Sequence, residues 1–224
     1  MFFTIILKYI IVSIVISLIF GATVSSSLII KKALKKDFVS PYLFQLWSLI
    51  LIIIIWTYYK PNISIFNTYN LLSWKNILLI FIAVVPTSII AYQGVKIKPN
   101  SPFKLRDFLS GVSMEIPQRL LVQNLFVILG VNVFVFHYLS LDILLNAIIW
   151  VQFIIVQEAI QGQKITKDIL PKVIASFWFS IWVGILYRDT GNIIIPMLSH
   201  GLQRVVTYKI CKKFGKSNPS KTST

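Results

Sequence analysis

Long apolar runs separated by short polar gaps make up almost the whole chain. A helix that crosses a bilayer needs about 20 mostly apolar residues. The sequence "YRDTGN" at 187–192 predicts a tight turn between the last two runs, which are short. Seven segments qualify: 4–30, 41–59, 76–94, 108–130, 142–161, 172–187 and 191–208. The pattern predicts an all-α fold, a polytopic transmembrane bundle of about seven spanning helices.

The composition agrees with this pattern. Of 224 residues, 56% are hydrophobic and only 13% are charged, and the mean hydropathy is +0.79, which excludes an ordinary soluble domain. A net charge of +15 would suggest nucleic acid as the partner of a soluble protein. Here Lys and Arg cluster in the gaps, so we interpret the charge as membrane topology and predict the lipid bilayer, not nucleic acid, as a partner. The Ile- and Lys-rich chain resembles bacterial sequences.

Basic residues alternate between rich and poor gaps along the chain. The second gap holds two Lys, the fourth gap none and the sixth one Arg. The rich gaps are the first (Lys31, Lys32, Lys35, Lys36), the third (Lys96, Lys98, Lys104, Arg106), the fifth (Lys164, Lys167) and the tail (Lys209, Lys212, Lys213, Lys216, Lys221). Cytoplasmic loops carry the excess of basic residues. We therefore predict a multi-pass cell-membrane protein with its N-terminus outside and its C-terminus in the cytoplasm.

A few ionisable or amide side chains fall inside the apolar segments, where they are functional candidates by default. From the predicted helix ends, Glu115 lies roughly 10 Å, Gln157 roughly 6 Å and His200 roughly 12 Å from the cytoplasmic face. We expect these three to line one cavity open to the cytoplasm. Glu115 and Arg119 are four residues apart, so we expect an ion pair between them. Pro117 between them predicts a kink.

Structural roles are an alternative for each of these residues. A Glu–Arg pair can hold a bundle together, and a membrane histidine is often a hydrogen-bonded packing residue. Gln157 and Glu158 can be hydrated at the interface. His137 falls in the outer fourth gap, where we expect it to be solvated.

The residues between about 108 and 205 resemble the CPBP family of intramembrane endopeptidases, which groups CAAX prenyl proteases with bacteriocin-processing and immunity proteins of the Abi group. The family's Glu-Glu-x-x-x-Arg helix corresponds to "MEIPQR" (114–119). Its Phe-x-x-x-His helix corresponds to "FIIVQ" (153–157), and its His-x-x-x-Asn helix to "HGLQR" (200–204). The stretch "GILYRDTGNIIIPMLSH" (184–200) is the most specific part of the resemblance.

Three positions depart from the family pattern. Met114 stands at the first glutamate, Gln157 at the histidine of the second motif and Arg204 at the asparagine. The positions that keep the family residue are Glu115, Arg119, Phe153 and His200. The resemblance implies that the first glutamate activates water, that the second-motif histidine holds this water, and that the last histidine and asparagine stabilise the oxyanion. Methionine and glutamine cannot act as a base at neutral pH.

Two functions follow as expectations. The first is an intramembrane endopeptidase with an atypical site, which cuts a membrane-associated peptide or protein near the cytoplasmic face. Glu115 or Glu158 would be its base, and His200 with Arg119 or Arg204 its electrophilic groups. The second is an inactive family member that binds a peptide or membrane partner, for example in bacteriocin self-immunity or as a scaffold. A transporter is a weaker third hypothesis.

The resemblance also divides the chain. It implies N-terminal transmembrane helices at 1–107 and a CPBP-like core bundle at 108–208, and the polar sequence predicts a disordered basic cytoplasmic tail at 209–224. A single histidine near carboxylates is a poor zinc set. We therefore predict no cofactor and leave a metal open.

Overall fold

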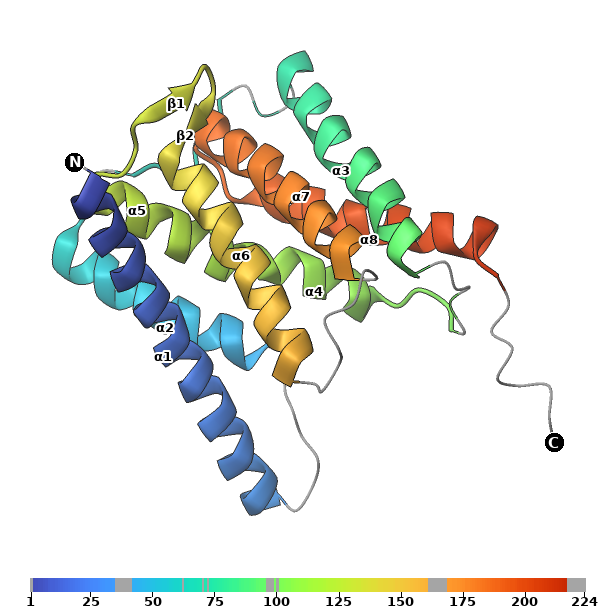
Figure 1. Ribbon diagram of the computed structural model, residues 1–224, viewed down its shortest axis with the longest axis horizontal. Helices are drawn as coiled ribbons and strands as arrows, with labels where there is room; N and C mark the ends of the chain where they lie inside the picture. Colours follow the sequence, from blue (N-terminus) through green and yellow to red (C-terminus); the bar gives the residue numbers. More distant parts are fainter. Residues whose placement is uncertain are drawn as a thin grey trace.

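The computed structural model describes residues 2–34, 42–61, 63–69, 71, 73–95, 99, 101–160 and 169–216. Its helices are α1 (Phe2–Leu34), α2 (Leu43–Tyr59), α3 (Trp74–Val95), α4 (Leu105–Glu115), the π-helix η1 (Ile116–Gln123), α5 (Asn124–Ile128), α6 (Leu141–Ile160), α7 (Ile169–Thr190) and α8 (Ile194–Phe214) (Figure 1). The strands β1 (Phe134–Phe136) and β2 (Leu139–Ser140) form a short antiparallel hairpin. The all-helical fold is confirmed, whereas the apolar pattern did not predict the hairpin.

Four helices are long and apolar enough to cross a membrane, which supports a location in the membrane. They are Phe2–Lys32, Trp74–Gly94, Leu141–Ala159 and Ile169–Thr190. The apolar helix α2 is shorter, with 17 residues. The fourth predicted segment is divided among α4, η1 and α5, and α8 contains several basic residues. Spanning length and composition are therefore shown for four of the seven predicted segments.

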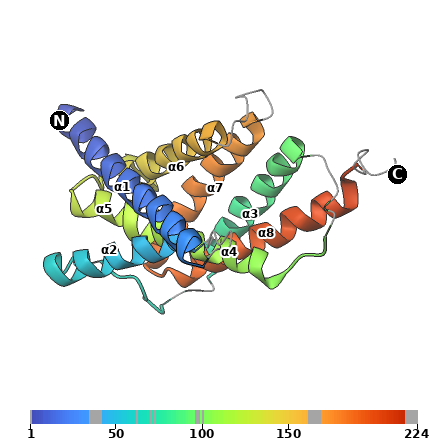
Figure 2. The same ribbon diagram turned by 90° about the horizontal axis from the view of Figure 1, so that it is seen from below.

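The chain ends and loops gather at two ends of the bundle (Figures 1 and 2). At one end, the segment after α2 meets the turn between α7 and α8, where the Ile193 amide donates to the Ile65 carbonyl at 3.0 Å. At the other end, the Tyr92 hydroxyl donates to the Phe214 carbonyl at 2.8 Å. The gaps that the sequence predicts to be outside therefore lie together, opposite the C-terminal end of α8.

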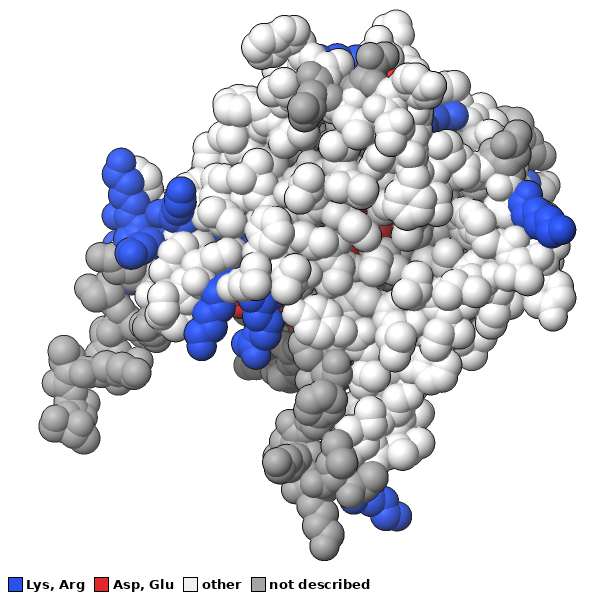
Figure 3. All heavy atoms as spheres, turned by 180° about the vertical axis from the view of Figure 1, so that it is seen from behind, with Lys and Arg blue, Asp and Glu red and all other residues white. Residues whose placement is uncertain are grey.

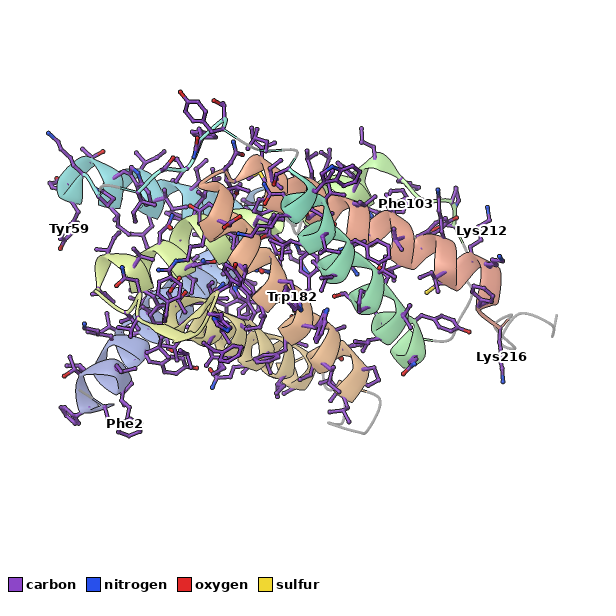
Figure 4. All side chains as sticks on the ribbon, turned by 90° about the horizontal axis from the view of Figure 1, so that it is seen from above. Phe2, Tyr59, Phe103, Trp182, Lys212 and Lys216 are labelled. Atoms are coloured by element: carbon purple, nitrogen blue, oxygen red, sulfur yellow. The ribbon has the colours of Figure 1, made fainter. Side chains whose placement is uncertain are left out.

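Side chains follow the same division. Figure 4 shows Phe2 and Tyr59 at one end of the bundle, with Phe103, Lys212 and Lys216 at the opposite end. The face in Figure 3 is largely uncharged, and its Lys and Arg side chains lie mainly at the margins. Many large apolar side chains are exposed, especially along α1. This surface suits hydrocarbon in the middle and water or lipid head groups at the edges.

Two predicted boundaries differ from the structure. The helix α8 continues to Phe214, so residues 209–214 of the predicted disordered tail are helical, because Tyr92 and the apolar residues near this end extend the packing. Residues 217–224 lie outside the described residues. The predicted division at 107 also separates helices that pack together, since α3 lies along α7 and α8.

Candidate functional site

The fourth apolar segment changes helix type at its proline. Proline has no backbone N–H, so Pro117 cannot bond to the carbonyl of Ser113, and the Ile116 amide donates to that carbonyl instead. The following turns form the π-helix η1, in which Pro117 to Gln123 are all buried. Short π segments are frequent at functional sites. The predicted kink is therefore a widening of the helix, and it carries Arg119 into the interior.

The predicted ion pair between Glu115 and Arg119 is confirmed. Nε of Arg119 donates to Oε2 of Glu115 at 3.0 Å, and both side chains are fully buried. The other donors of Arg119 reach Oε1 of Gln123 at 3.1 Å and the carbonyl and hydroxyl of Ser180 at 3.0 and 3.2 Å. A buried guanidinium is costly unless its charge and its N–H groups are paired, and these contacts meet both needs.

His200 on α8 completes the surroundings of Glu115. Its Nδ1 lies 2.6 Å from Oε1 of Glu115, and its ring packs against Phe179 with centroids 4.7 Å apart. Because Arg119 pairs with Glu115 as a carboxylate, we assign the proton to Nδ1, which donates to it. In the part of the chain that the structure describes, Nε2 has no hydrogen-bond partner. The imidazole is thus oriented by a buried carboxylate, with one nitrogen left for a ligand.

The polar contacts continue to the opposite end of the bundle. Nε2 of Gln123 reaches Oδ2 of Asp142 at 3.4 Å and the carbonyl of Gly184 at 3.2 Å. Oδ1 of Asp142 accepts a bond from Arg188 at 3.0 Å. We call the six side chains joined in this way the buried polar chain: His200, Glu115, Arg119, Gln123, Asp142 and Arg188. It connects α8, α4, η1, α6 and α7 through the middle of the protein.

A cavity of about 270 Å³, here called the polar cavity, lies beside His200. The predicted site residues Gln157, His200 and Arg204 line it, and so does Met114. Glu115 does not line it, so this part of the predicted cavity is wrong. A step of one residue turns a helix by about 100°, which puts Met114 at the cavity and Glu115 behind His200.

The other predicted catalytic groups take different places. Arg119 is fully buried and does not line the polar cavity. Glu158, considered as a second base, pairs with Lys172 at 3.0 Å and also lies outside the lining. His137 is exposed in the hairpin, as expected. Among the described residues, no three His, Cys, Asp or Glu side chains come together as a metal site.

Glycines let α4 and α8 approach closely enough for the contact between Glu115 and His200. A Cβ added to Gly201 would lie 2.4 Å from Cε2 of Phe108, and one added to Gly111 would lie 3.0 Å from the His200 carbonyl oxygen. The first separation is shorter than real Cβ atoms show, and the second is tighter than most Cβ contacts. The two helices therefore pack through their glycines, which fixes the height of His200 beside α4.

We expect Gly201→Ala to destabilise the protein by about 1–3 kcal/mol, because the new methyl group must displace the ring of Phe108 in a packed interface. Unfolding of the purified protein in detergent, followed by circular dichroism, measures this. Gly21→Ala is the matched control, since nothing lies within 4 Å of its added Cβ. Equal stability of the two variants would contradict the close packing.

No protein-family model, curated protein or solved structure matches this chain. The resemblance of residues 108–205 to the CPBP family therefore stays a prediction that rests on the motifs. Sequence reasoning missed Gln123, Asp142 and Arg188 in the buried polar chain. An available signal was the pairing of opposite charges at the predicted outer ends of the fifth and sixth apolar segments.

Proposed function

We propose that this protein is an intramembrane endopeptidase of the CPBP type with an atypical site, which accepts a membrane-associated peptide or protein in the polar cavity. The observation that carries the proposal is the contact between Glu115 and His200 at the cavity wall. A carboxylate that holds Nδ1 of an imidazole and leaves Nε2 for substrate or water is a suitable arrangement for a general base.

The chemistry can proceed with residues of this chain. Nε2 of His200 takes a proton from water, and the hydroxide adds to the carbonyl carbon of the peptide bond. Arg204 lines the same cavity, and its guanidinium donates to the resulting oxyanion. The carbon–nitrogen bond then breaks, and the imidazolium returns its proton to the leaving amine. Glu115 stays ionised and stabilises the imidazolium, so it acts as a positioning residue instead of the predicted base.

The sidedness of this reaction follows from charge. The polar cavity is lined near the C-terminal ends of α3 and α6 and the N-terminal end of α7, by Ala91, Gln157 and Lys172. In the sequence, the basic gap three follows α3, and the basic gap five joins α6 to α7. Basic loops face the cytoplasm. We therefore place the polar cavity in the cytoplasmic half of the membrane, with the N-terminus outside.

Binding without cleavage is the second candidate, and Met114 favours it. The side chain at the position of the family's first glutamate has no proton to exchange, and its sulfur accepts a hydrogen bond from Nε2 of Gln45 at 3.3 Å. The neighbouring carboxylate of Glu115 is sealed from the cavity. A protein of this kind would hold a peptide or membrane partner, as in bacteriocin self-immunity or a scaffold.

We expect His200→Gln to reduce peptide cleavage by roughly 10²–10⁴-fold, because glutamine cannot take a proton from water. The measurement is mass spectrometry of products from a membrane-peptide library that is incubated with the reconstituted protein. The matched control is His137→Gln, which changes the only other histidine of the chain and lies on the exposed hairpin. If wild type binds peptides and cuts none, the second candidate replaces the first.

A further inference from the structure

A second hollow, here called the lateral groove, adjoins the polar cavity. It has a volume of about 200 Å³ and lies between α1 and α6, two helices that run beside each other (Figures 1 and 2). Its walls are mainly apolar and include Ile16, Phe20 and Val156. Val156 is 52% exposed on the outer surface of α6. The groove therefore opens toward the hydrocarbon of the bilayer.

The lateral groove and the polar cavity share two wall residues, Phe153 and Gln157. The Phe153 ring meets the ring of Phe20 on α1 edge-on, with centroids 5.5 Å apart. One aromatic side chain thus stands between an apolar space open to lipid and a polar space inside the bundle.

The polar cavity has an excess of positive charge. Lys172 and Arg204 line it, and no Asp or Glu among the described residues does. Lys172 is paired with Glu158, which lies outside the lining. The carboxylate of Asp107 on α4 attracts the positive charge of Arg204. Arg204 is exposed and has no hydrogen bond among the described residues, so its guanidinium is available to an anion.

We propose that the two spaces form one site for a lipid with a single apolar chain and an anionic head group. The head group binds Arg204 in the polar cavity, and the chain passes Phe153 into the lateral groove. The two volumes together fall within the range of about 300–1,000 Å³ that is usual for small-ligand sites. The inference goes beyond the proposed function, because such a lipid can bind whether or not the protein cuts peptides.

Trp150 provides a direct test. It lines the polar cavity, and its ring centroid lies 5.4 Å from that of Phe153. Its side chain is only 2% exposed, so bulk lipid cannot reach it. Bromine quenches tryptophan fluorescence at short range. The probe is 9,10-dibromostearate, titrated into the full-length protein in phosphatidylcholine vesicles. The quenching that Trp150→Phe removes reports occupation of this site.

We expect the probe to quench Trp150 saturably. In Arg204→Gln its affinity, measured from the same titration, should fall roughly tenfold to a hundredfold, as for loss of a hydrogen bond to a charged group. Ser17→Phe, which fills the lateral groove, should weaken it as well. Lys212→Gln is the charge-matched control, since Lys212 is exposed near the end of α8 and lines neither space. The uncharged methyl ester of the probe should bind as weakly as the acid binds to Arg204→Gln.

Three results would overturn the proposal. The first is no saturable quenching in folded wild type, and the second is equal quenching by the acid and its methyl ester. The third is binding of a membrane peptide, but not of the acid, in the polar cavity. This last result leaves the proposed peptidase intact. Absence of peptide cleavage by the wild type leaves the lipid site intact, so the two proposals fail separately.

Discussion

Arg119→Leu is expected to destabilise the folded protein by about 3–5 kcal/mol, the usual cost of removing one partner of a buried ion pair. Glu115 would keep a buried negative charge with only His200 beside it. Gln123 and Ser180 would each lose a donor as well. The measurement is unfolding in mixed detergent micelles, followed by circular dichroism.

Arg106→Leu is the control for loss of an arginine, because Arg106 is exposed and such surface changes usually cost less than about 0.5 kcal/mol. The double variant Glu115→Leu with Arg119→Leu should be more stable than Arg119→Leu alone, since no unpaired carboxylate remains. Equal stability of Arg119→Leu and Arg106→Leu would mean that the buried polar chain does not stabilise the bundle.

Met114→Glu is expected to raise peptide cleavage above the wild-type rate, by less than the roughly 10²–10⁴-fold of a sole general base, because His200 already takes the proton from water. Met114 lines the polar cavity with His200, so a glutamate there puts a carboxylate beside the bound water. Gln45, which now donates to the sulfur, can donate to the new carboxylate. The measurement is the initial rate of cleavage of a peptide that the wild type cuts. If the wild type cuts none, a peptide that it binds is used.

Met114→Gln is the matched control, because glutamine has the same length but cannot accept a proton at neutral pH. We expect it to behave like wild type. Equal rates for the glutamate, glutamine and wild-type proteins, with all three folded, would show that a carboxylate at 114 has no catalytic partner. Absence of cleavage by all three folded proteins would favour the binding function over the peptidase.

The apolar pattern was sufficient to predict an all-helical bundle, and the four-residue spacing was sufficient to predict the ion pair between Glu115 and Arg119. Glu115 and Arg119 are four residues apart in a predicted membrane segment. Burying either charge alone in hydrocarbon costs much free energy, so an ion pair is the expected arrangement. Spacing along one helix could not decide which neighbour faces the polar cavity. That choice between Met114 and Glu115 depends on the π-helix that begins at Ile116 and on the approach of α8 at Gly201.

Asp142 and Arg188, at the outer end of the buried polar chain, could not be predicted from the sequence for a different reason. Arg188 was counted only for the charge of its loop, and Asp142 lay at the first position of a predicted helix. Neither residue looks unusual in sequence, because charges near helix ends are ordinary. Their pairing depends on α6 and α7 lying side by side. Gly184 of α7 faces α6, where an added Cβ would be 2.7 Å from Cγ2 of Ile143.

The buried polar chain also determines how the protein responds to bilayer thickness. Sliding α8, η1, α6 or α7 along the membrane normal breaks several charged hydrogen bonds at once, so these helices keep one relative height. They meet a thinner or thicker membrane as a single body, and the lipid must deform around them or the whole body must tilt. The helix α1, roughly 50 Å long, has no part in the chain and is held to this body by apolar packing and by the hydrogen bond from Tyr9 to Gln152, so its tilt is less constrained. Because the lateral groove lies between α1 and this body, membrane thickness would set its width.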